Sequence, residues 1–378
     1  MNAKLRAEEF LSRTSVTLNG PNPWDPQIHD ERLYDRIFSG GTLAVGESYM
    51  DGWWDVENMS EFFFRLFHSQ AAQTAPLLSV AMVIQLAKSA FLNLQNQKRA
   101  YEVGRRHYDI GNDLYEKMLD TRMMYSCGYW KEAKTLEKSQ EDKLDLICRK
   151  IGLKTGDTVL DIGCGWGGFA AFAAERYGAK VTGITISKEQ AALAQQRTSE
   201  LDVDIRLQDW RTLGGETYTH IVSVGMFEHV GPKNYRVFMQ KVRELLSDEG
   251  LFLLQTIGNG KTVRHLEPWY DRYIFPNGHL PSTAQITKAT DRKWYGEALL
   301  TMEDWHNFGS DYDKTLSAWY ENFERAWPDI KEKYDERFRR MWKYYLLQSA
   351  GMFRARYIHL WQIVFSKTGM VGGYASIR

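Results

Sequence analysis

The sequence predicts an α/β protein in which a doubly wound parallel sheet follows a small helical domain. From about residue 140 onward, short apolar runs alternate with amphipathic segments of helical length, which is typical of βαβ units. Before residue 94 there is no such alternation, and helical segments are separated by turn-rich text. We therefore expect a helical domain over residues 1–94, a linker over 95–106 and the sheet domain over 107–378.

The elements of the sheet domain follow one another in a regular order. Apolar runs predict strands over 157–163, 179–187, 203–210, 220–227, 250–258 and 357–367. Helical patterns lie over 167–178, 188–200, 235–250 and roughly 313–356. Gly178 and Gly250 are expected to end their helices, because glycine readily adopts the left-handed conformation that follows a helix.

Composition limits the classes of protein that need to be considered. Lys plus Arg and Asp plus Glu both number 48, so no overall field favours nucleic acid or an anionic surface. Three cysteines give no disulfide framework, which favours a reducing, cytoplasmic compartment. The first residues lack the apolar core of a signal peptide, and no apolar run approaches the roughly 18 residues of a membrane span. No Cys/His spacing predicts a metal site.

One stretch of the first domain has two interpretations. Residues 76–94 form a strongly apolar helical pattern that begins at Pro76. This helix is either part of a domain core or a face that meets lipid or a partner chain. Four cations of a basic run follow it: Lys98, Arg99, Arg105 and Arg106. The run is either a solvated linker or a binding segment for anionic headgroups.

A glycine loop joins the first strand to its helix. Gly163, Gly165 and Gly167 follow Asp161 in "LDIGCGWGG", and the loop opens a helix within a complete βαβ unit. Loops without side chains let backbone N–H groups approach a ligand at a helix N-terminus. This form resembles motif I of S-adenosylmethionine-dependent methyltransferases, which implies a class I, Rossmann-like fold and S-adenosylmethionine as co-substrate.

Residues at the carboxyl ends of the other strands are candidates for the same site, because ligands of such sheets bind at that edge. They are Thr185, Ile186, Asp209, Trp210, Glu228, Gln255 and Ile257. Many methyltransferases close the second strand with an acid that binds the ribose. Here Thr185 and Gln190 are expected to provide those contacts. Trp210 is expected to stack on adenine or, alternatively, to be an ordinary core tryptophan.

Several longer motifs stand in order along nearly the whole chain. They are "GESYMDGWWD", "HYDIGNDLY", "MMYSCGYW", "LDIGCGWGG", "GMFEHVGPKNY", "YIFPNGHLPS", "MEDWHNFGSDYD" and "FRARYIHLWQIVFS". With these motifs the chain resembles bacterial cyclopropane fatty acid synthases and, more distantly, mycolic acid cyclopropane synthases. The resemblance implies methylene transfer from S-adenosylmethionine to a cis double bond of a phospholipid acyl chain. It also implies a bound bicarbonate that acts as the base.

The resemblance assigns roles to individual residues. It implies that Cys127, the backbone of Ile257 and the hydroxyl of Tyr312 contact the anion. It places Tyr125 and Ser126 next to S-adenosylmethionine. A carboxylate can accept the O–H hydrogen bond of bicarbonate, so we expect Glu228 to orient the anion rather than act as the base. Its neighbour His229 is expected to be structural.

Two positions depart from the best-known members of the family. Gln255 stands where a histidine is common, so an N–H donor is retained but a titrating group is lost. Ser349 stands where relatives commonly have cysteine, so no thiol nucleophile is available there. Three aromatic residues, Tyr273, Phe275 and Trp305, are candidates either for the acyl tunnel or for ordinary packing, and packing is favoured for Trp305.

Two other functions remain open. An enzyme of the same fold could stop after methyl transfer to a lipid or an amine, and a lipid-binding scaffold could have lost the chemistry. The expected partners are the phospholipid bilayer, at the inner face of the cell membrane with peripheral association, and a second copy of the chain in a homodimer. Nucleic acid is not expected.

Overall fold

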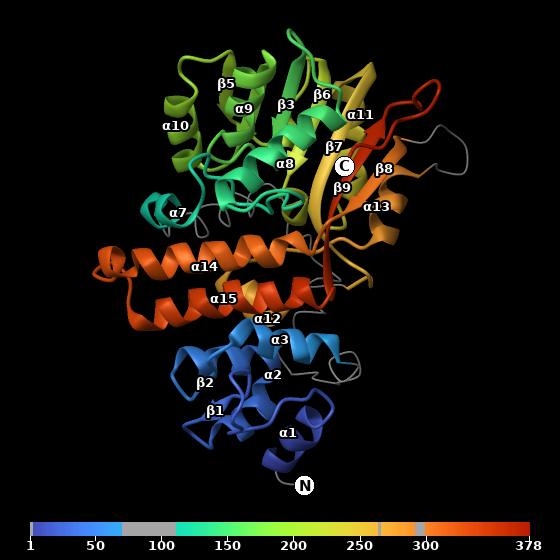
Figure 1. Cartoon of the computed structure of the whole chain (residues 1–378). Helices are drawn as coiled ribbons and strands as arrows, with labels where there is room; N and C mark the ends of the chain where they lie inside the picture. Colours follow the sequence, from blue (N-terminus) through green and yellow to red (C-terminus); the bar gives the residue numbers. More distant parts are fainter. Residues whose placement is uncertain (1–2, 70–110, 264–265, 292–298) are drawn as a thin grey trace. The chain divides into compact units, whose positions relative to one another are not determined.

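The structure is a computed structural model that describes residues 3–69, 111–263, 266–291 and 299–378 (Figure 1). It divides into a helical unit and a sheet unit, which are described separately. The linker expected over 95–106, the helix expected over 76–94 and its four following cations (Lys98, Arg99, Arg105 and Arg106) lie outside the described residues.

The helical unit draws on three separate segments, namely residues 3–69, 266–278 and 312–358. Its helices are α1 (Ala3–Leu11), α2 (Leu33–Met50), α3 (Met59–His68), α12 (Pro268–Tyr273), α14 (Asp311–Ile330) and α15 (Glu336–Arg354). Two short strands, β1 (Gln27–Ile28) and β2 (Trp54–Asp55), pair antiparallel. The sequence division at residue 94 did not anticipate that later helices complete this unit.

Aromatic packing explains why α15 belongs with the first helices. The ring of Tyr344 lies 5.3 Å from that of Phe63 and 4.6 Å from that of Trp269. A Cβ at Gly351 would lie 2.7 Å from the Cβ of Phe63, so this glycine permits the close approach of α15 to α3. An isolated N-terminal segment would leave these rings in water, which is unfavourable in proportion to the apolar area exposed.

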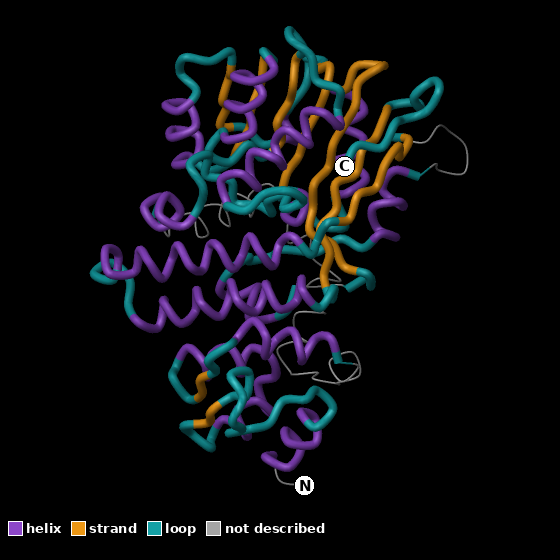
Figure 2. The backbone as a smooth tube through the Cα atoms, viewed as in Figure 1, coloured by secondary structure: helices purple, strands orange, loops and turns teal. Residues whose placement is uncertain are grey.

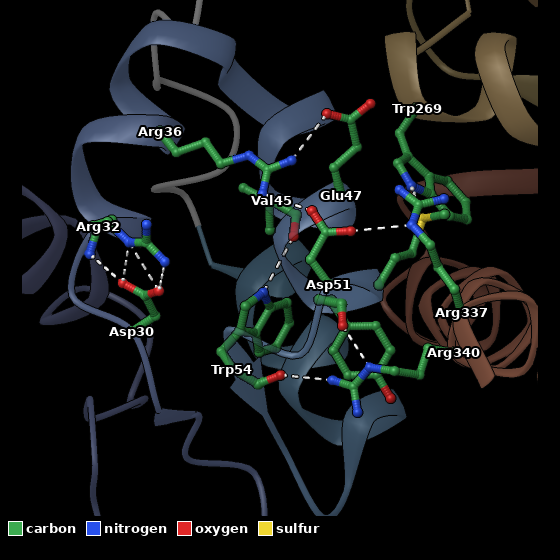
Figure 3. Close-up of polar contacts among 12 residues, drawn as sticks. Asp30, Arg32, Arg36, Val45, Glu47, Asp51, Trp54, Trp269, Arg337 and Arg340 are labelled. Carbon is green, nitrogen blue, oxygen red and sulfur yellow. Dashed lines mark hydrogen bonds and ion pairs between the residues drawn. The ribbon is translucent and has the colours of Figure 1, made fainter.

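Arg340 of α15 also connects this helix to α2 and β2 through polar contacts (Figure 3). Its guanidinium donates to the carbonyl of Tyr49, to the carbonyl of Trp54 at 2.9 Å and to the carboxylate of Asp55 at 2.8 Å. It also lies 4.1 Å from the centre of the Tyr49 ring. Arg337, three residues earlier, pairs with Asp51 at 3.0 Å but is more exposed.

The sheet unit contains one seven-stranded sheet with the order β5-β4-β3-β6-β7-β9-β8 (Figure 2). Its strands are β3 (Thr158–Ile162), β4 (Lys180–Thr185), β5 (Val203–Leu207), β6 (Tyr218–Val224), β7 (Leu246–Asn259), β8 (Thr301–Asn307) and β9 (Ile358–Ser366). β3 pairs parallel with β4 and β6, as do β4 with β5 and β6 with β7. β8 and β9 pair antiparallel.

Helices cover both faces of this sheet, as expected of a doubly wound fold. The covering helices are α8 (Leu136–Lys150), α9 (Gly168–Tyr177), α10 (Lys188–Arg197), α11 (Tyr235–Leu245) and α13 (Thr283–Thr290), and α7 (Asn112–Met118) belongs to the same unit. Leu160 of β3 packs in a core cluster with residues of α11 and α13. Its neighbour Val159 packs in a second cluster with residues of α8, α9 and α10. Successive strand residues thus face opposite layers.

The six strands predicted from the sequence are confirmed, and Gly178 ends its helix in the left-handed conformation at φ 65°. The helix predicted over 235–250 is wrong at its end. α11 stops at Leu245, and β7 begins at the next residue, Leu246, which is fully buried and pairs with Tyr218. The pairing of β7 with β6 therefore outweighs the tendency of Gly250 to end a helix. The sequence analysis also missed β8 and α13.

No helix within the described ranges combines the length and the apolar character that crossing a bilayer requires. The described residues also contain no cluster of His, Cys, Asp and Glu side chains suited to a metal ion.

Replacing Arg340 with methionine should destabilise the helical unit by about 2–3 kcal/mol, because the buried carbonyl of Trp54 would lose this donor and that of Tyr49 would keep only the N–H of Gly52, while the apolar stem is kept. Arg337→Met is the matched control on the same helix. Its exposed ion pair should contribute less than about 1 kcal/mol. Urea unfolding of both variants measures the difference, and equal losses would contradict this role of Arg340.

Candidate functional site

The glycine loop has the open geometry that a ligand requires. Gly163, Gly165 and Gly167 all have positive φ, at 90°, 55° and 79°. A Cβ on Gly163 would lie 2.7 Å from Met226, so this position needs glycine for packing as well. Around Gly165, in contrast, no described atom lies within 4 Å of an added Cβ. The loop therefore presents backbone to open space at the start of α9.

The segment 120–128 lies beside this loop and beside the end of β6. A Cβ on Gly168, the first residue of α9, would lie 2.5 Å from both the carbonyl oxygen of Arg122 and the sulfur of Met124. A Cβ on Gly225 would lie 3.8 Å from that of Ser126. The structure thus brings Ser126, and Tyr125 next to it, to the edge that holds the glycine loop.

The polar pair predicted after β4 is formed. Thr185 Oγ1 donates to Gln190 Oε1 at 2.9 Å, and both side chains are buried. Ser187 begins α10 by accepting the N–H of Gln190 at 3.3 Å, and it donates its own N–H to Thr185 Oγ1 at 3.2 Å. Ile186 lies half-buried between them. The turn after β4 therefore carries no acid, but it carries an ordered set of hydroxyl and amide groups.

Asp209 and Trp210 are held mainly by contacts with their neighbours. The Asp209 carboxylate accepts the N–H of Arg211 at 2.9 Å and pairs with its guanidinium at 2.9 Å. Trp210 is buried within the core cluster of the sheet, edge-on to Phe238 at 5.2 Å, with the Arg211 guanidinium 4.6 Å from its ring. The core interpretation of Trp210 is thus confirmed, and its stacking on adenine stays a prediction.

Asp161 and Lys143 bring opposite charges into the interior beneath the glycine loop. Burial raises the pKa of Asp161 to about 7, and the positive charge of Lys143 opposes this shift. Burial lowers the pKa of Lys143 to about 8, and the negative charges of Asp120 and Asp161 oppose that shift. Neither residue is exposed by more than 2%. The cofactor edge therefore contains a buried cation that the sequence analysis did not identify.

Glu228 is the main polar residue of the part of the site that lies at the ends of β6 and β7. It lies in a short 3-10 turn, η2 (Phe227–His229), directly after β6. Its Oε1 accepts the backbone N–H of Ile257 on β7 at 2.6 Å. Its Oε2 is buried and has no hydrogen-bond partner among the described residues. Burial raises the pKa of Glu228 to about 7, and the Ile257 N–H acts in the opposite direction. The N–H of Ile257 is thus already engaged with Glu228.

Gln255 lies two residues before Ile257 on the same strand, next to the end of β6. Its backbone carbonyl accepts the N–H of Gly225 at 3.0 Å. Its side chain is fully buried, and Oε1 accepts a hydrogen bond from Gln362 Nε2 of β9 at 2.9 Å. This bond leaves Gln255 Nε2 without an acceptor in the described part of the chain. Glu228 and Gln255 together provide an unused acceptor and an unused donor.

The remaining predicted anion contacts lie in different places. Cys127 is fully buried in the sheet unit, next to Ser126, and its thiol donates to the carbonyl of Gly128 at 3.1 Å. Tyr312 belongs to the helical unit, where its ring packs 4.5 Å from that of Phe353. The structure therefore brings Cys127, Gln255, Ile257 and Glu228 into one unit, and Tyr312 into the other.

The secondary candidates are mostly packing residues. His229 lies in the 3-10 turn rather than in an extended segment, and burial lowers its pKa to about 4, so it is neutral near pH 7. Trp305 packs edge-on to Trp361 at 5.0 Å against the sheet core. In the helical unit, Tyr273 donates to Glu47 at 2.9 Å and Phe275 packs on Tyr345. Ser349 there shares a hydrogen bond with the Tyr270 hydroxyl.

Sequence reasoning missed Gln362, Gln140 and Lys143. The two residues of α8 gave a usable signal, because Gln140 and Lys143 fall at helical spacing with the buried Leu144 and Ile147. Gln362 gave a weaker one, as a polar residue inside an otherwise apolar strand. Its partner Gln255 comes from a strand more than 100 residues earlier in the chain, so the sequence gives no indication of the pair.

Comparison with known proteins gives consistent similarities. Residues 95–363 match the family model "Mycolic acid cyclopropane synthetase". The chain is 50% identical over 361 residues to the Escherichia coli (strain K12) "Cyclopropane-fatty-acyl-phospholipid synthase", covering 96% of this chain and 92% of that protein. It is 39% identical over 276 residues to a "Probable fatty acid methyltransferase" of Pseudomonas putida, covering 69% and 68%. The solved "mycolic acid cyclopropane synthase CmaA1 complexed with SAH and CTAB" superposes with a TM-score of 0.64 at 30% identity, covering 71% and 98%.

Replacing Glu228 with glutamine should flatten the pH dependence of stability. A carboxyl group whose pKa rises on folding from about 4.5 to about 7 binds its proton more tightly in the folded state. Its contribution therefore falls as pH rises from about 4.5 to 7, by up to about 3 kcal/mol. Unfolding free energies measured from pH 5 to 8 should decline less in Glu228→Gln than in the wild type. Parallel curves would contradict the raised pKa.

Proposed function

Because the chain belongs to the mycolic acid cyclopropane synthetase family, we propose that it transfers a methylene group from S-adenosylmethionine to the cis double bond of unsaturated phospholipid acyl chains. The family expected from the sequence motifs is confirmed by these similarities, and so is the methyltransferase fold. The observation that carries the proposal is the 50% identity to the Escherichia coli synthase over 96% of the chain. The open glycine loop beside Ser126 supports S-adenosylmethionine as the co-substrate.

The chemistry explains why a buried carboxylate is useful at this edge. An alkene is a weak nucleophile, so the sulfonium methyl group must be held in line with it in a site without water. Methyl transfer leaves a carbocation on the lipid, and ring closure requires the former methyl group to lose one proton. A strongly basic side chain beside a sulfonium would itself be methylated, so we infer that the proton acceptor is a small bound anion.

The residues present offer both kinds of contact that such an anion needs. Glu228 Oε2 is a buried acceptor without a donor, and Gln255 Nε2 is a buried donor without an acceptor. Bicarbonate, when bound, supplies an oxygen that takes the proton. Ionised Glu228 would accept its O–H, and Gln255 would donate to another of its oxygens. Cys127 and, from the helical unit, Tyr312 remain proposed contacts. The backbone of Ile257 is a proposed contact only if its N–H exchanges Glu228 for the anion.

A second candidate is methyl transfer without ring closure. It is favoured by the similarity to the Pseudomonas putida protein named as a probable fatty acid methyltransferase. Incubation with labelled S-adenosylmethionine and mixed phospholipid vesicles, followed by mass spectrometry, separates the two. A cyclopropane product gains CH₂ and loses its double bond. A branched product that keeps a double bond, or a methylated amine, would instead support the second candidate.

Glu228→Gln should keep S-adenosylmethionine binding but lower turnover on the order of 10²-fold, because the amide lacks the charge that orients the anion. Wild-type activity should also fall in buffer stripped of carbon dioxide and recover when bicarbonate is added. Turnover of the variant and the bicarbonate response of the wild type are measured in the same vesicle assay. Activity that ignores bicarbonate would mean that a side chain is the base.

We also propose that the enzyme binds the phospholipid bilayer peripherally through the segment that carries Lys98, Arg99, Arg105 and Arg106. Each cation near an anionic surface contributes about 1 kcal/mol before screening. Replacing all four with glutamine should weaken co-sedimentation with anionic vesicles at low salt and leave S-adenosylmethionine affinity unchanged. Equal sedimentation of variant and wild type would remove this segment from the membrane role. A homodimer remains a further proposal.

A further inference from the structure

Helix α8 carries two completely buried lysines with different surroundings. Lys150, in its last turn, contacts Nδ1 of His306 at 3.1 Å and pairs with Asp304 at 3.9 Å, both on β8. Lys143 lies two turns earlier, about 10 Å along the helix axis, and its contacts are with the segment that approaches the glycine loop. A buried ammonium group costs free energy unless it is paired and hydrogen-bonded, so each lysine needs a specific partner set.

The partner set of Lys143 converges on Ser126. Its ammonium donates to Ser126 Oγ at 2.9 Å and to Gln140 Oε1 at 2.6 Å. Gln140, one turn earlier on the same face of α8, donates its Nε2 to the carbonyl of Ser126 at 2.8 Å. One helix face thus holds both the side chain and the backbone of this serine.

Two acids, Asp120 and Asp161, interact with the charge of Lys143. Asp120 accepts the N–H groups of Arg122 at 2.9 Å and Met124 at 2.8 Å, which shapes the start of the same segment. Asp161 lies on β3, directly before the glycine loop, on the strand face that α8 and α9 cover. The negative charges of Asp120 and Asp161 both favour the charged form of Lys143. The lysine is therefore hydrogen-bonded to one of the two segments that border the open loop, and its charge interacts with the acid of the other.

We propose that Lys143 is a positioning residue for S-adenosylmethionine. It fixes Ser126 together with Gln140, and it balances the buried charge of Asp161 beneath the loop. Lys143 acts through these residues, since it is itself fully buried. The inference rests on the proposed function, because the glycine loop beside Ser126 is assigned to the cofactor there.

The test compares Lys143→Met with Lys150→Met. Both changes remove a buried ammonium group from α8 and keep a similar side-chain volume, so both should lower thermal stability. Calorimetric titration with S-adenosylmethionine should give a Kd raised about tenfold or more for Lys143→Met, the loss expected for one charged hydrogen bond. The Kd of Lys150→Met should stay within about twofold of the wild type. At saturating S-adenosylmethionine, turnover of Lys143→Met should recover to within about threefold.

A double variant provides the second measurement. If Lys143 acts through Ser126, then Lys143→Met combined with Ser126→Ala should bind no more weakly than the weaker single variant, because contacting residues are not additive. Gln140→Leu replaces Lys143→Met in both measurements if the latter does not fold. Unchanged affinity in Lys143→Met, equal losses in the two lysine variants, or additive losses in the double variant would each overturn the inference.

These outcomes are separable from failure of the proposed function. A wild-type protein that binds S-adenosylmethionine but forms no cyclopropane product would overturn the lipid reaction, while the two Kd values would still decide the role of Lys143. A wild-type protein that does not bind S-adenosylmethionine would overturn both.

Discussion

The parallel pairing of β3 through β7 determines where the polar chemistry of the sheet unit gathers. All of these strands end at the same edge, so residues that are far apart in the sequence become neighbours there. Glu228 follows β6, and Ile257 lies near the end of β7. The backbone N–H of Ile257 donates to Glu228 Oε1 at 2.6 Å, which connects the two strand ends. The glycine loop after β3 occupies the next position. The reaction proposed here needs both parts, a cofactor cradle and a proton acceptor, on one rigid support.

Burial at this edge changes the usual charge states of its acids. Asp161 and Glu228 both have a pKa raised to about 7, with burial as the main cause in each. The two acids differ in the interaction that opposes this rise in pKa. Lys143 brings a cation close to Asp161, whereas Glu228 is stabilised by a backbone N–H. A cation beside Glu228 would compete for a bound anion, and an unpaired carboxylate beside the glycine loop would be costly. Different groups therefore offset the burial of the two acids, a side-chain cation at Asp161 and a backbone N–H at Glu228. This difference agrees with the different ligands proposed for them, the cofactor and an anion.

Six of the seven strands and part of this edge could be predicted because they follow local rules. Alternating segments gave the strands, and the residues after them gave Thr185, Gln190 and Glu228. What could not be predicted depends on contacts between distant segments. The pair of Gln255 with Gln362 joins strands that only the folded sheet brings together. The end of α11 at Leu245 is decided by pairing of Leu246 with Tyr218, against a glycine signal five residues later. The addition of α15 to the helical unit depends on rings, such as that of Tyr344, that meet only after folding.

The presence of a glutamine at position 255 concentrates the acid–base behaviour of this part of the site in Glu228. Gln255 does not titrate, and its bond from Gln362 keeps its N–H group available as a donor at every pH. Glu228 Oε1 must stay an acceptor, because the Ile257 N–H points at it. Any proton that Glu228 binds therefore sits on Oε2, the unused atom. In its ionised form that atom would accept the O–H of the proposed bicarbonate. In its protonated form it would be a donor and would compete for the oxygen that has to receive the proton. The pKa of Glu228 is raised to about 7. The protonation of this one oxygen therefore determines whether the proposed site can accept a proton.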